Sequence, residues 1–389
     1  MKYEDAPGKS ESIKLLQRIY DNKAINAIRK IDKPFVIYGA GNLGKMAIEY
    51  FKIIGKSPVL IIDKLYDNTF TNNTFENIKI SSLDNVSVEI RQRSLIIITV
   101  VNSSYIEILN FLLSQGYKDI VHFYDVTEAY KDIHPLSNGW ILSNFDNNDF
   151  EKTSDVLTIW NDDISRAHHL QFIAWHRLRE EWVFKNSEID VNNRYFTSDV
   201  NNILNDNEAL LDVGAHKGEV SQKFIINVNN KYKKIWMIEP DTINYSEIIN
   251  NLNFKNEINL KKIEIINRAV SDNNFNEIFY DGLGYSSQFS KFGNKNINVV
   301  TIDQLKLSPS FIKMHLEGWE LGALKGAINT ILTNKPIMAV TCYHNSLGVW
   351  QIPLWLMNLK FDDSTFYKYS FRLHGWCGTG GVVYCIPTR

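Results

Sequence analysis

The stretch LLDVGAHKGEV, residues 210–220, decides the fold of the second half of this chain. It predicts an apolar strand over 209–213, a turn containing Gly214 and Gly218, and then a helix. Glycine adopts positive φ without a Cβ clash, and the N-terminus of the helix offers free N–H groups to an anion. A second apolar strand, 235–238, ends in Glu239. The pattern indicates half of a nucleotide-binding α/β unit, with the acid on the ribose hydroxyls. An ordinary strand–turn–helix of an α/β core is the alternative.

The spacing of the glycines bears on which nucleotide is bound. A dinucleotide fingerprint is G-x-G-x-x-G, whereas this stretch reads Asp212-x-Gly214-x-x-x-Gly218. That order resembles motif I of the S-adenosylmethionine (SAM) methyltransferases, although His216 stands where many of them carry a glycine. The resemblance implies SAM as the cofactor, bound by residues of this motif and of the acid-ended strand: Asp212, Gly214, Ala215, His216, Gly218, Glu239 and Pro240. After a third strand over 263–266, Ala269 and Asp272 are the candidates for holding the adenine ring.

Composition sets the broad class of the protein. A chain of 389 residues favours two domains plus a connector. Forty-two basic and 44 acidic residues leave no net charge to attract nucleic acid. Three cysteines without zinc spacing are typical of a reduced cytoplasmic protein. The longest apolar run, 95–101, is too short for a membrane span, and the N-terminus has no signal core. We therefore expect a cytoplasmic protein, with self-association into a homo-oligomer left open.

A second glycine motif lies near the N-terminus. A strand over 35–38 leads into GAGNLG, with Gly39, Gly41 and Gly44, and then a helix; the next strand, 59–62, ends in Asp63. One interpretation is a nucleotide site for NAD or a nucleotide sugar, with Asp63 on the ribose. The other is a Rossmann-like domain that keeps its glycines for tight turns and serves in docking or dimerisation. No Tyr-x-x-x-Lys pair suggests hydride transfer nearby.

The middle of the chain is predicted to connect two domains. Residues 126–150 are polar and contain glycine and asparagine, and residues 154–184 are expected to be helical. His168, His169 and His176 lie there without metal-ligand spacing. We expect an α/β protein with two Rossmann-like domains: 1–130, a linker with connector helices over 131–192, and a second domain over 193–389. A helix is also expected within 11–30.

The candidate catalytic residues follow two later strands. FIKMHLEGWELGALKGA, residues 311–327, predicts a central strand followed by a turn and a helix. Residues at the carboxyl end of such a strand face the ligand cleft of a doubly wound sheet, which makes His315, Glu317 and Lys325 candidates. A strand over 337–342 ends at Tyr343 and His344. The closing segment adds Arg372 and His374.

The second domain resembles the FkbM family of SAM-dependent methyltransferases. The resemblance covers about 190 residues of ordered motifs: NRYF at 193–196, LLDVGAHKG, IEPD, RAVSD at 268–272, VTIDQL, LEG-x-E-x-x-x-LKGA and YHNSL-x-x-x-QIP. It implies a class I methyltransferase fold and O-methylation of a sugar or polyketide hydroxyl. A Rossmann-like unit ahead of such a domain is similar to an arrangement in bacterial surface-glycan loci. One residue departs from the family pattern K-x-D-x-E-G, because His315 replaces the Asp.

These residues predict a mechanism and leave two other functions open. Histidine, with an unperturbed pKa of about 6.5, suits a base that removes the proton of an acceptor hydroxyl. His315 is the first candidate, followed by His344 and His374, whereas Glu317, Tyr343 and Arg372 are expected to bind a small-molecule or glycan acceptor. A turn at Glu317 would also allow a divalent metal. The alternatives are a nucleotide-sugar oxidoreductase or epimerase centred on GAGNLG, and a non-catalytic SAM-binding scaffold.

Overall fold

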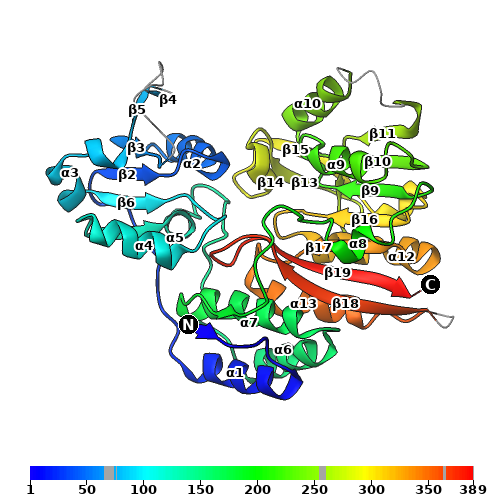
Figure 1. Cartoon of the computed structure of the whole chain (residues 1–389). Helices are drawn as coiled ribbons and strands as arrows, with labels where there is room; N and C mark the ends of the chain where they lie inside the picture. The colour runs from blue at the N-terminus through cyan, green and yellow to red at the C-terminus, as the bar shows by residue number, and fades with distance from the viewer. Residues whose placement is uncertain (65–73, 76, 254–259, 362–364, 389) are drawn as a thin grey trace.

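Two mainly parallel sheets, each covered by helices, dominate the computed structural model (Figure 1). The structure describes residues 1–64, 74–75, 77–253, 260–361 and 365–388. The N-terminal sheet and its helices form one lobe, and the C-terminal sheet forms the other. The predicted α/β class, with parallel sheets in two regions of the chain, is therefore confirmed.

The C-terminal sheet has the strand order β11-β10-β9-β16-β17-β19-β18. Counted along the chain these strands run 3-2-1-4-5-7-6, and β19 is antiparallel to both of its neighbours. The order reverses between β9 and β16, where a doubly wound sheet opens its ligand crevice. The strands are β9 (Ala209–Val213), β10 (Lys234–Ile238), β11 (Ile263–Ile266), β16 (Phe311–Met314), β17 (Ile337–Thr341), β18 (Phe366–Leu373) and β19 (Gly381–Thr388).

A smaller sheet, with the order β12-β15-β13-β14, is inserted between β11 and β16 and borders the open end of the crevice. Its strands are β12 (Ala269–Val270), β13 (Phe275–Tyr280), β14 (Gln288–Phe289) and β15 (Lys295–Val300). The helices of this lobe are α8 (Ser198–Asn201), α9 (Glu219–Asn227), α10 (Thr242–Asn253), α11 (Glu320–Lys325), α12 (Ile328–Asn334) and α13 (Gln351–Met357). Short 3-10 turns are η2 (Leu260–Lys262), η3 (Gly284–Ser286), η4 (Ile302–Leu305) and η5 (Ser346–Val349).

The N-terminal sheet has the order β4-β5-β3-β2-β6-β7, parallel except for β4. Its strands β2, β3 and β6 are fully buried, which explains their continuous apolar sequences. The strands are β2 (Phe35–Tyr38), β3 (Leu60–Ile62), β4 (Thr74–Phe75), β5 (Ile78–Ser81), β6 (Leu95–Ile98) and β7 (Asp119–His122). The helices are α2 (Asn42–Ile53), α3 (Val88–Arg93), α4 (Tyr105–Ser114) and α5 (Phe123–Glu128), with the turn η1 (Leu83–Asn85).

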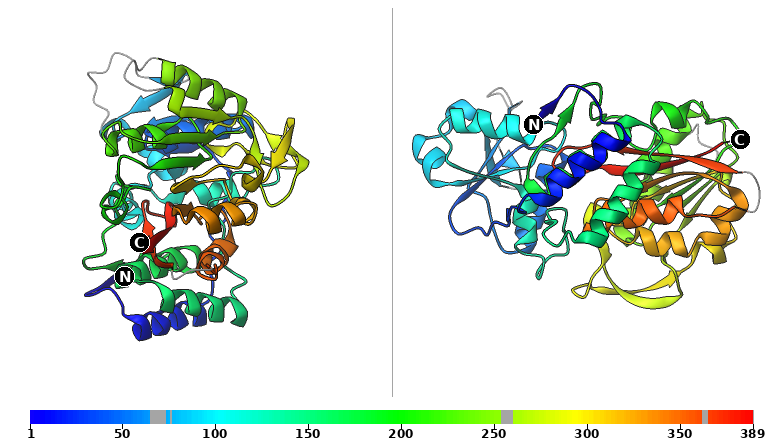
Figure 2. Two further views of the ribbon diagram at one scale, coloured as in Figure 1. Left: turned by 90° about the vertical axis from the view of Figure 1, so that its right-hand side faces the viewer. Right: turned by 90° about the horizontal axis from the view of Figure 1, so that it is seen from below.

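A helical layer formed by α1 (Lys9–Asp21), α6 (Asn147–Ile159) and α7 (Asp163–Leu178) lies beneath the two sheets (Figures 1 and 2). The helix expected within 11–30 ends at Asp21, and the one expected over 154–184 is two helices. The two helices are separated because Asp162 caps the N-terminus of α7: its carboxylate accepts the Ser165 N–H at 2.7 Å. Beside this layer, β1 (Lys2–Tyr3) pairs with β8 (Val183–Phe184).

Helix α7 is part of the C-terminal lobe. Its Ser165 Oγ accepts the Phe371 N–H, and its His168 Nδ1 accepts the Leu373 N–H, both from β18. His168, His169 and His176 are buried and each contacts a backbone carbonyl, so they serve packing rather than metal binding. We therefore propose that the expected connector helices form a layer of the second lobe.

The path of the chain also changes the expected start of the first domain. Helix α1 packs on α6 and α7, and its Leu16 and Ile19 belong to the same apolar core as Trp160. The Ile25 N–H donates to Arg177 O at 2.9 Å, and the Leu142 N–H donates to His176 O at 2.8 Å. The chain thus leaves and rejoins the helical layer at one end of α7. We propose that the N-terminal domain is an insertion spanning about 22–135, because those attachment points close it off.

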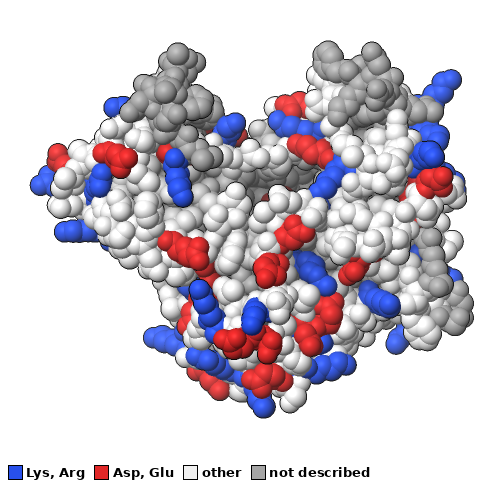
Figure 3. Space-filling view, in the orientation of Figure 1, with Lys and Arg blue, Asp and Glu red and all other residues white. Residues whose placement is uncertain are grey.

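The surface carries charges of both signs. Acidic and basic side chains are interspersed over the face that holds α1 and α6, and this face is hollowed between the two lobes (Figure 3). Within the described residues no helix combines the length and apolarity that a membrane crossing requires. Cys342, Cys377 and Cys385 are all in the described part of the chain, where each is buried and free of disulfides.

Candidate active site

A cavity of about 660 Å³ opens at the carboxyl ends of the central strands of the C-terminal sheet. Gly214 follows β9, Glu239 follows β10, and His315 follows β16; all three line it. The cavity thus joins predicted SAM residues to predicted catalytic ones. The other candidates on its wall are His216, Pro240, Ala269 and Glu317.

Glu239 is positioned by backbone donors at the end of β10. Its Oε2 accepts the His216 N–H at 2.7 Å, and its Oε1 accepts the Asp241 N–H at 3.0 Å. Burial raises the pKa of Glu239 to about 7, although these hydrogen bonds act in the opposite direction. The fraction of Glu239 in the carboxylate form therefore changes around neutral pH. A ligand whose hydroxyls donate hydrogen bonds to Glu239 would bind best to the carboxylate form.

Asp212 lies behind the cavity rather than on its wall. Its carboxylate pairs with the buried Lys313 ammonium at 2.9 Å and accepts the Ser221 hydroxyl at 2.8 Å. Lys313 also donates to Gly214 O at 2.6 Å. The pair therefore fixes the turn that follows β9. Ala215 is buried and Gly218 begins α9 with a φ of +83°, so these two residues also shape the turn without lining the cavity.

A loop over 281–287, between β13 and β14, covers one side of the cavity. The Tyr285 ring stacks on the His216 ring, with centroids 3.7 Å apart and planes at 20°. Asn244 Nδ2 donates to Gly284 O at 3.1 Å and ties the loop to α10. The sequence marks this loop by its Gly and Ser residues, but that composition does not identify Tyr285 as a cavity residue.

The prediction for Asp272 is not supported by its position. Ala269 lines the cavity, but β12 ends at Val270 and the chain then turns away to pack against α11. Asp272 is exposed, outside the cavity lining, and its carboxylate contacts the Ser271 hydroxyl at 3.4 Å. A Cβ at Gly326 would approach Ser271 O to 2.0 Å, which shows how closely this segment packs on the end of α11. Asp272 is therefore not placed to hold the adenine ring.

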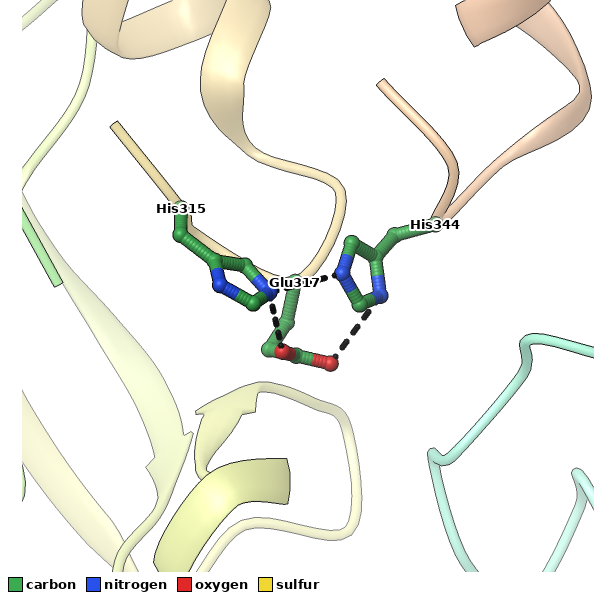
Figure 4. A group of neighbouring side chains, drawn as sticks. All are labelled: His315, Glu317 and His344. Atoms are coloured by element: carbon green, nitrogen blue, oxygen red, sulfur yellow. Dashed lines mark hydrogen bonds and ion pairs between the residues drawn. The ribbon is translucent and has the colours of Figure 1, made fainter. Parts of the chain in front are cut away.

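His315, Glu317 and His344 converge into one cluster beside the cavity (Figure 4). His315 Nε2 lies 3.1 Å from Glu317 Oε1, and His344 Nδ1 lies 3.1 Å from Glu317 Oε2. The two Nε2 atoms are 2.9 Å apart. In a regular strand the side chains of residues 315 and 317 would point to the same face of the sheet. Here β16 ends at Met314, so neither residue belongs to the strand. Glu317 and Gly318 adopt φ values of +51° and +104°, and this turn directs the carboxylate back to both rings.

A second carboxylate fixes that turn. Glu320 Oε1 accepts the Leu316 N–H at 2.9 Å and the Thr341 hydroxyl at 2.8 Å, and Oε2 accepts the Gly318 N–H at 3.1 Å. Glu320 is fully buried at the start of α11. Glu320 is the second acid of the LEG-x-E motif, and the motif alone does not indicate this role.

Two aromatic side chains complete the surroundings of His315. Tyr195 Oη lies 3.0 Å from His315 Nδ1, and Tyr343 Oη lies 3.3 Å from His315 Nε2. Arg194 donates to Tyr343 Oη at 2.7 Å. Tyr343 therefore contacts the cluster rather than lining the cavity. Arg194 and Tyr195 belong to the NRYF segment, which the sequence singles out without indicating their contact with His315.

The charges in the cluster follow from burial and proximity. Burial is the main cause that lowers the pKa of His315 to about 3, so this ring is neutral at neutral pH. Burial alone would raise the pKa of Glu317, but the adjacent His344 and His315 bring it well below its usual range. The cluster thus combines an ionised carboxylate with a neutral imidazole, and a ring with so low a pKa is a weaker base than the free histidine on which the prediction for His315 rests.

Three further candidates lie outside the cavity lining. His374 Nδ1 contacts Asp190 O at 2.6 Å and its Nε2 contacts Tyr384 Oη at 2.8 Å, and burial lowers its pKa to about 4. Arg372 pairs with Asp162 at 3.0 Å on β18. Lys325 is exposed in the last turn of α11. The roles expected for His374 and Arg372 are therefore not supported, because both side chains are engaged elsewhere.

Packing explains two of the three glycines of the N-terminal motif, Gly39 and Gly44. A Cβ at Gly44 would lie 2.1 Å from Gly39 O, and Gly39 itself has a φ of +111°. Gly41 precedes α2 as its N-cap residue. Asp63 Oδ2 accepts the Ala40 N–H at 2.6 Å. Gly39 and Gly44 therefore serve turn packing, whereas no atom of the described residues lies within 4 Å of a Cβ at Gly41, so both interpretations of the motif stay predictions.

The comparisons with known proteins agree with this geometry. Residues 212–365 match the model of the methyltransferase FkbM domain. The C-terminal half of this chain contains an FkbM methyltransferase domain. This domain places the chain among the SAM-dependent methyltransferases and implies SAM as the cofactor. The matched residues begin at Asp212, within β9, and include the cavity lining and the cluster of His315, Glu317 and His344.

One solved structure shares the fold over the full length. The crystal structure of methyltransferase FkbM from Methylobacillus flagellatus KT is 20% identical, with a TM-score of 0.59, and the alignment covers 98% of this chain and 94% of that one. A precorrin-6y C5,15-methyltransferase from Geobacter metallireducens GS-15 is 10% identical over 53% of this chain and 96% of its own, with a TM-score of 0.29 that supports no conclusion. No curated protein matches the chain.

Proposed function

We propose that this FkbM methyltransferase transfers the methyl group of SAM to a hydroxyl of a sugar, a nucleotide sugar or a surface-glycan precursor. The observation that carries the proposal is the shared cavity: Gly214 and Glu239 line it together with His315 and Glu317. A donor bound over Gly214 and Glu239 would present its methyl group toward the cluster at the end of β16. Catalysis then depends largely on holding oxygen, methyl carbon and sulfur in line.

The chemistry is a displacement at the methyl carbon. The acceptor O–H gives its proton to the His315–Glu317–His344 cluster, and the oxygen lone pair forms the new O–C bond. The C–S bond breaks with its electron pair going to sulfur, which converts the sulfonium to the neutral thioether of S-adenosylhomocysteine. A sugar hydroxyl is a poor nucleophile at neutral pH, so the proton acceptor must lie within hydrogen-bond reach.

The walls of the cavity support a polar acceptor with flat apolar faces. Phe289 and Trp319 meet edge to face with ring centroids 4.5 Å apart, and both line the cavity. Gln288 and Arg268 add hydrogen-bond donors to the same wall. Aromatic faces combined with a few placed polar groups suit the C–H faces and hydroxyls of a sugar.

A methylation assay tests this function. The purified chain would be incubated with SAM and a panel of sugars and nucleotide sugars, and mass spectrometry would detect the gain of one methylene. His315→Ala should lower turnover about 10²–10⁴-fold, the usual contribution of proton-transfer catalysis, while SAM affinity stays unchanged. His374→Gln is the matched control, because His374 lies outside the cavity lining. If His315→Ala turned over a confirmed acceptor at the parental rate, the proposed role of His315 would be wrong.

A further inference from the structure

We propose that His315, Glu317 and His344 bind a divalent transition-metal ion on the wall of the cavity. The site is inferred from the geometry of the three side chains, and its use in methyl transfer rests on the proposed function. The ligands are His315 Nε2, His344 Nε2 and Glu317 Oε1. Two of these come from the ends of adjacent parallel strands, β16 and β17, and the third comes from the turn between β16 and α11.

Two spacings between the proposed ligand atoms, both from His315 Nε2, fit a single ion. Metal–nitrogen and metal–oxygen bonds of this type are about 2.0–2.2 Å long, so two ligands at right angles stand about 3 Å apart. The two Nε2 atoms are separated by 2.9 Å, and His315 Nε2 lies 3.1 Å from Glu317 Oε1. Ligand atoms from all three side chains lie within 4.8 Å of one another.

The other nitrogen of each ring already has an oxygen partner. His315 Nδ1 lies 3.0 Å from Tyr195 Oη, and His344 Nδ1 lies 3.1 Å from Glu317 Oε2. A metal-binding histidine typically donates its second N–H to such an oxygen, which fixes the tautomer and the ring orientation. With both Nδ1 atoms protonated, the lone pairs of both Nε2 atoms face the same point between the rings.

The backbone is arranged to hold this geometry before any ligand arrives. Glu317 has left-handed φ although it is not a glycine, a conformation that persists only where the surroundings impose it. Glu320 imposes it by accepting the Leu316 and Gly318 N–H groups on either side. Fixed ligands lose little conformational freedom on binding, which favours a specific site over a loose contact.

The donor set indicates the class of metal. Two imidazoles and one carboxylate suit Zn²⁺, Fe²⁺, Ni²⁺ or Co²⁺, whereas Mg²⁺ prefers oxygen ligands only. Three protein ligands leave coordination positions open, and His315 and Glu317 both line the cavity. An ion there would replace direct proton transfer to the two rings, because it occupies their lone pairs; it would act as a Lewis acid toward an acceptor hydroxyl and would lower the pKa of that hydroxyl.

Calorimetry on the full-length chain tests the site directly. After dialysis against a chelator, the protein would be titrated with Zn²⁺ and, separately, with Mg²⁺. One equivalent of Zn²⁺ should bind, and Mg²⁺ should bind much more weakly. Glu317→Gln, which is isosteric, and His344→Ala should each weaken Zn²⁺ binding by roughly 100-fold or more, since even outer partners contribute 10–100-fold. Glu264→Gln, on the exposed edge strand β11, should bind Zn²⁺ like the parent.

Each outcome separates the metal site from the function. Absence of Zn²⁺ binding by the parent, or unchanged binding in both folded cluster variants, overturns the metal site. If in addition the metal-free protein methylates a hydroxyl acceptor at the full rate, the proposed function stands without a metal. Conversely, stoichiometric Zn²⁺ binding that depends on Glu317 and His344, with no hydroxyl acceptor methylated in the presence or absence of Zn²⁺, supports the metal site and rejects the O-methyl transfer.

Discussion

At the scale of single residues, we expect Glu239 to make SAM binding sensitive to pH. A ribose donates two hydroxyl protons, so it needs the carboxylate form. Because burial raises the pKa of Glu239 to about 7, the carboxylate fraction grows between pH 6 and 8. SAM affinity should therefore rise with pH across this window. Glu239→Ala should cost roughly 1.5–3 kcal/mol of binding free energy.

Calorimetric titration with SAM at several pH values checks this prediction. Glu239→Gln serves as the control, because the titration of SAM itself is common to both proteins and cancels in the comparison. The difference in affinity between parent and variant should widen as pH rises. A constant, non-zero difference would show that Glu239 does not titrate between pH 6 and 8, and unchanged affinity in both variants would show that Glu239 does not contact the ribose.

Gly214 and Gly218 form a matched pair that separates backbone strain from steric clash. Both have positive φ, +75° and +83°. A Cβ at Gly214 would lie 1.9 Å from His315 O, whereas the nearest atom to a Cβ at Gly218 is 3.7 Å away. Gly218→Ala should cost about 1–2 kcal/mol of unfolding free energy from strain alone. Gly214→Ala should cost about 1–3 kcal/mol more, through the clash. Chemical denaturation of both variants would measure this, and equal losses would contradict it.

At the scale of elements, the loop over 281–287 is expected to act as a wall of the SAM site. Tyr285→Ala removes the ring that stacks on His216, which should weaken SAM binding by about 0.5–1.5 kcal/mol. Tyr285→Phe keeps the stack and should bind SAM like the parent. Calorimetry distinguishes the cases, and a Phe variant as weak as the Ala variant would instead assign the effect to the Tyr285 hydroxyl.

Elements whose signals are local could be predicted from the sequence, whereas contacts between distant segments could not. Gly214, Glu239 and His315 end consecutive central strands, and a doubly wound sheet brings such ends together. The approach of His344 to Glu317 depends instead on the left-handed backbone conformation of residue 317. A glutamate at this position does not indicate that conformation. Arg372 looks like a ligand-binding residue in the sequence, but its partner Asp162 lies 210 positions away.

At the scale of the whole molecule, the two lobes share contacts near the active site. Trp140 Nε1, from the segment that leaves the N-terminal lobe, donates to Tyr343 O at 3.2 Å. The Trp376 N–H, from the C-terminal lobe, donates to Val101 O at 2.7 Å. The Val101–Trp376 contact therefore joins the two lobes, whereas Trp140, which lies beyond the proposed insertion, supports the segment that carries Tyr343.

These contacts refine which part of the chain is dispensable for SAM binding. A chain beginning near residue 150 lacks α1, so the partners of the fully buried Leu16 and Ile19 lose their cover. Each such loss costs about 2–5 kcal/mol, which together approaches the total stability of a typical domain. That truncation should melt far below the parent or fail to fold. An internal replacement keeps α1 and should avoid this cost.

The internal replacement follows from where the chain enters and leaves the N-terminal lobe. Ile25 and Leu142 are hydrogen-bonded to the consecutive residues Arg177 and His176, so a short Gly-Ser linker in place of residues 27–135 can span the gap. The replaced protein should fold and bind SAM with nearly parental affinity, because residues 212–315 that line the SAM end of the cavity are all retained. Circular dichroism and calorimetry test both parts. A folded replacement that has lost SAM binding would show that the N-terminal lobe contributes to the SAM site, and a stable, SAM-binding chain beginning near residue 150 would show that α1 is dispensable.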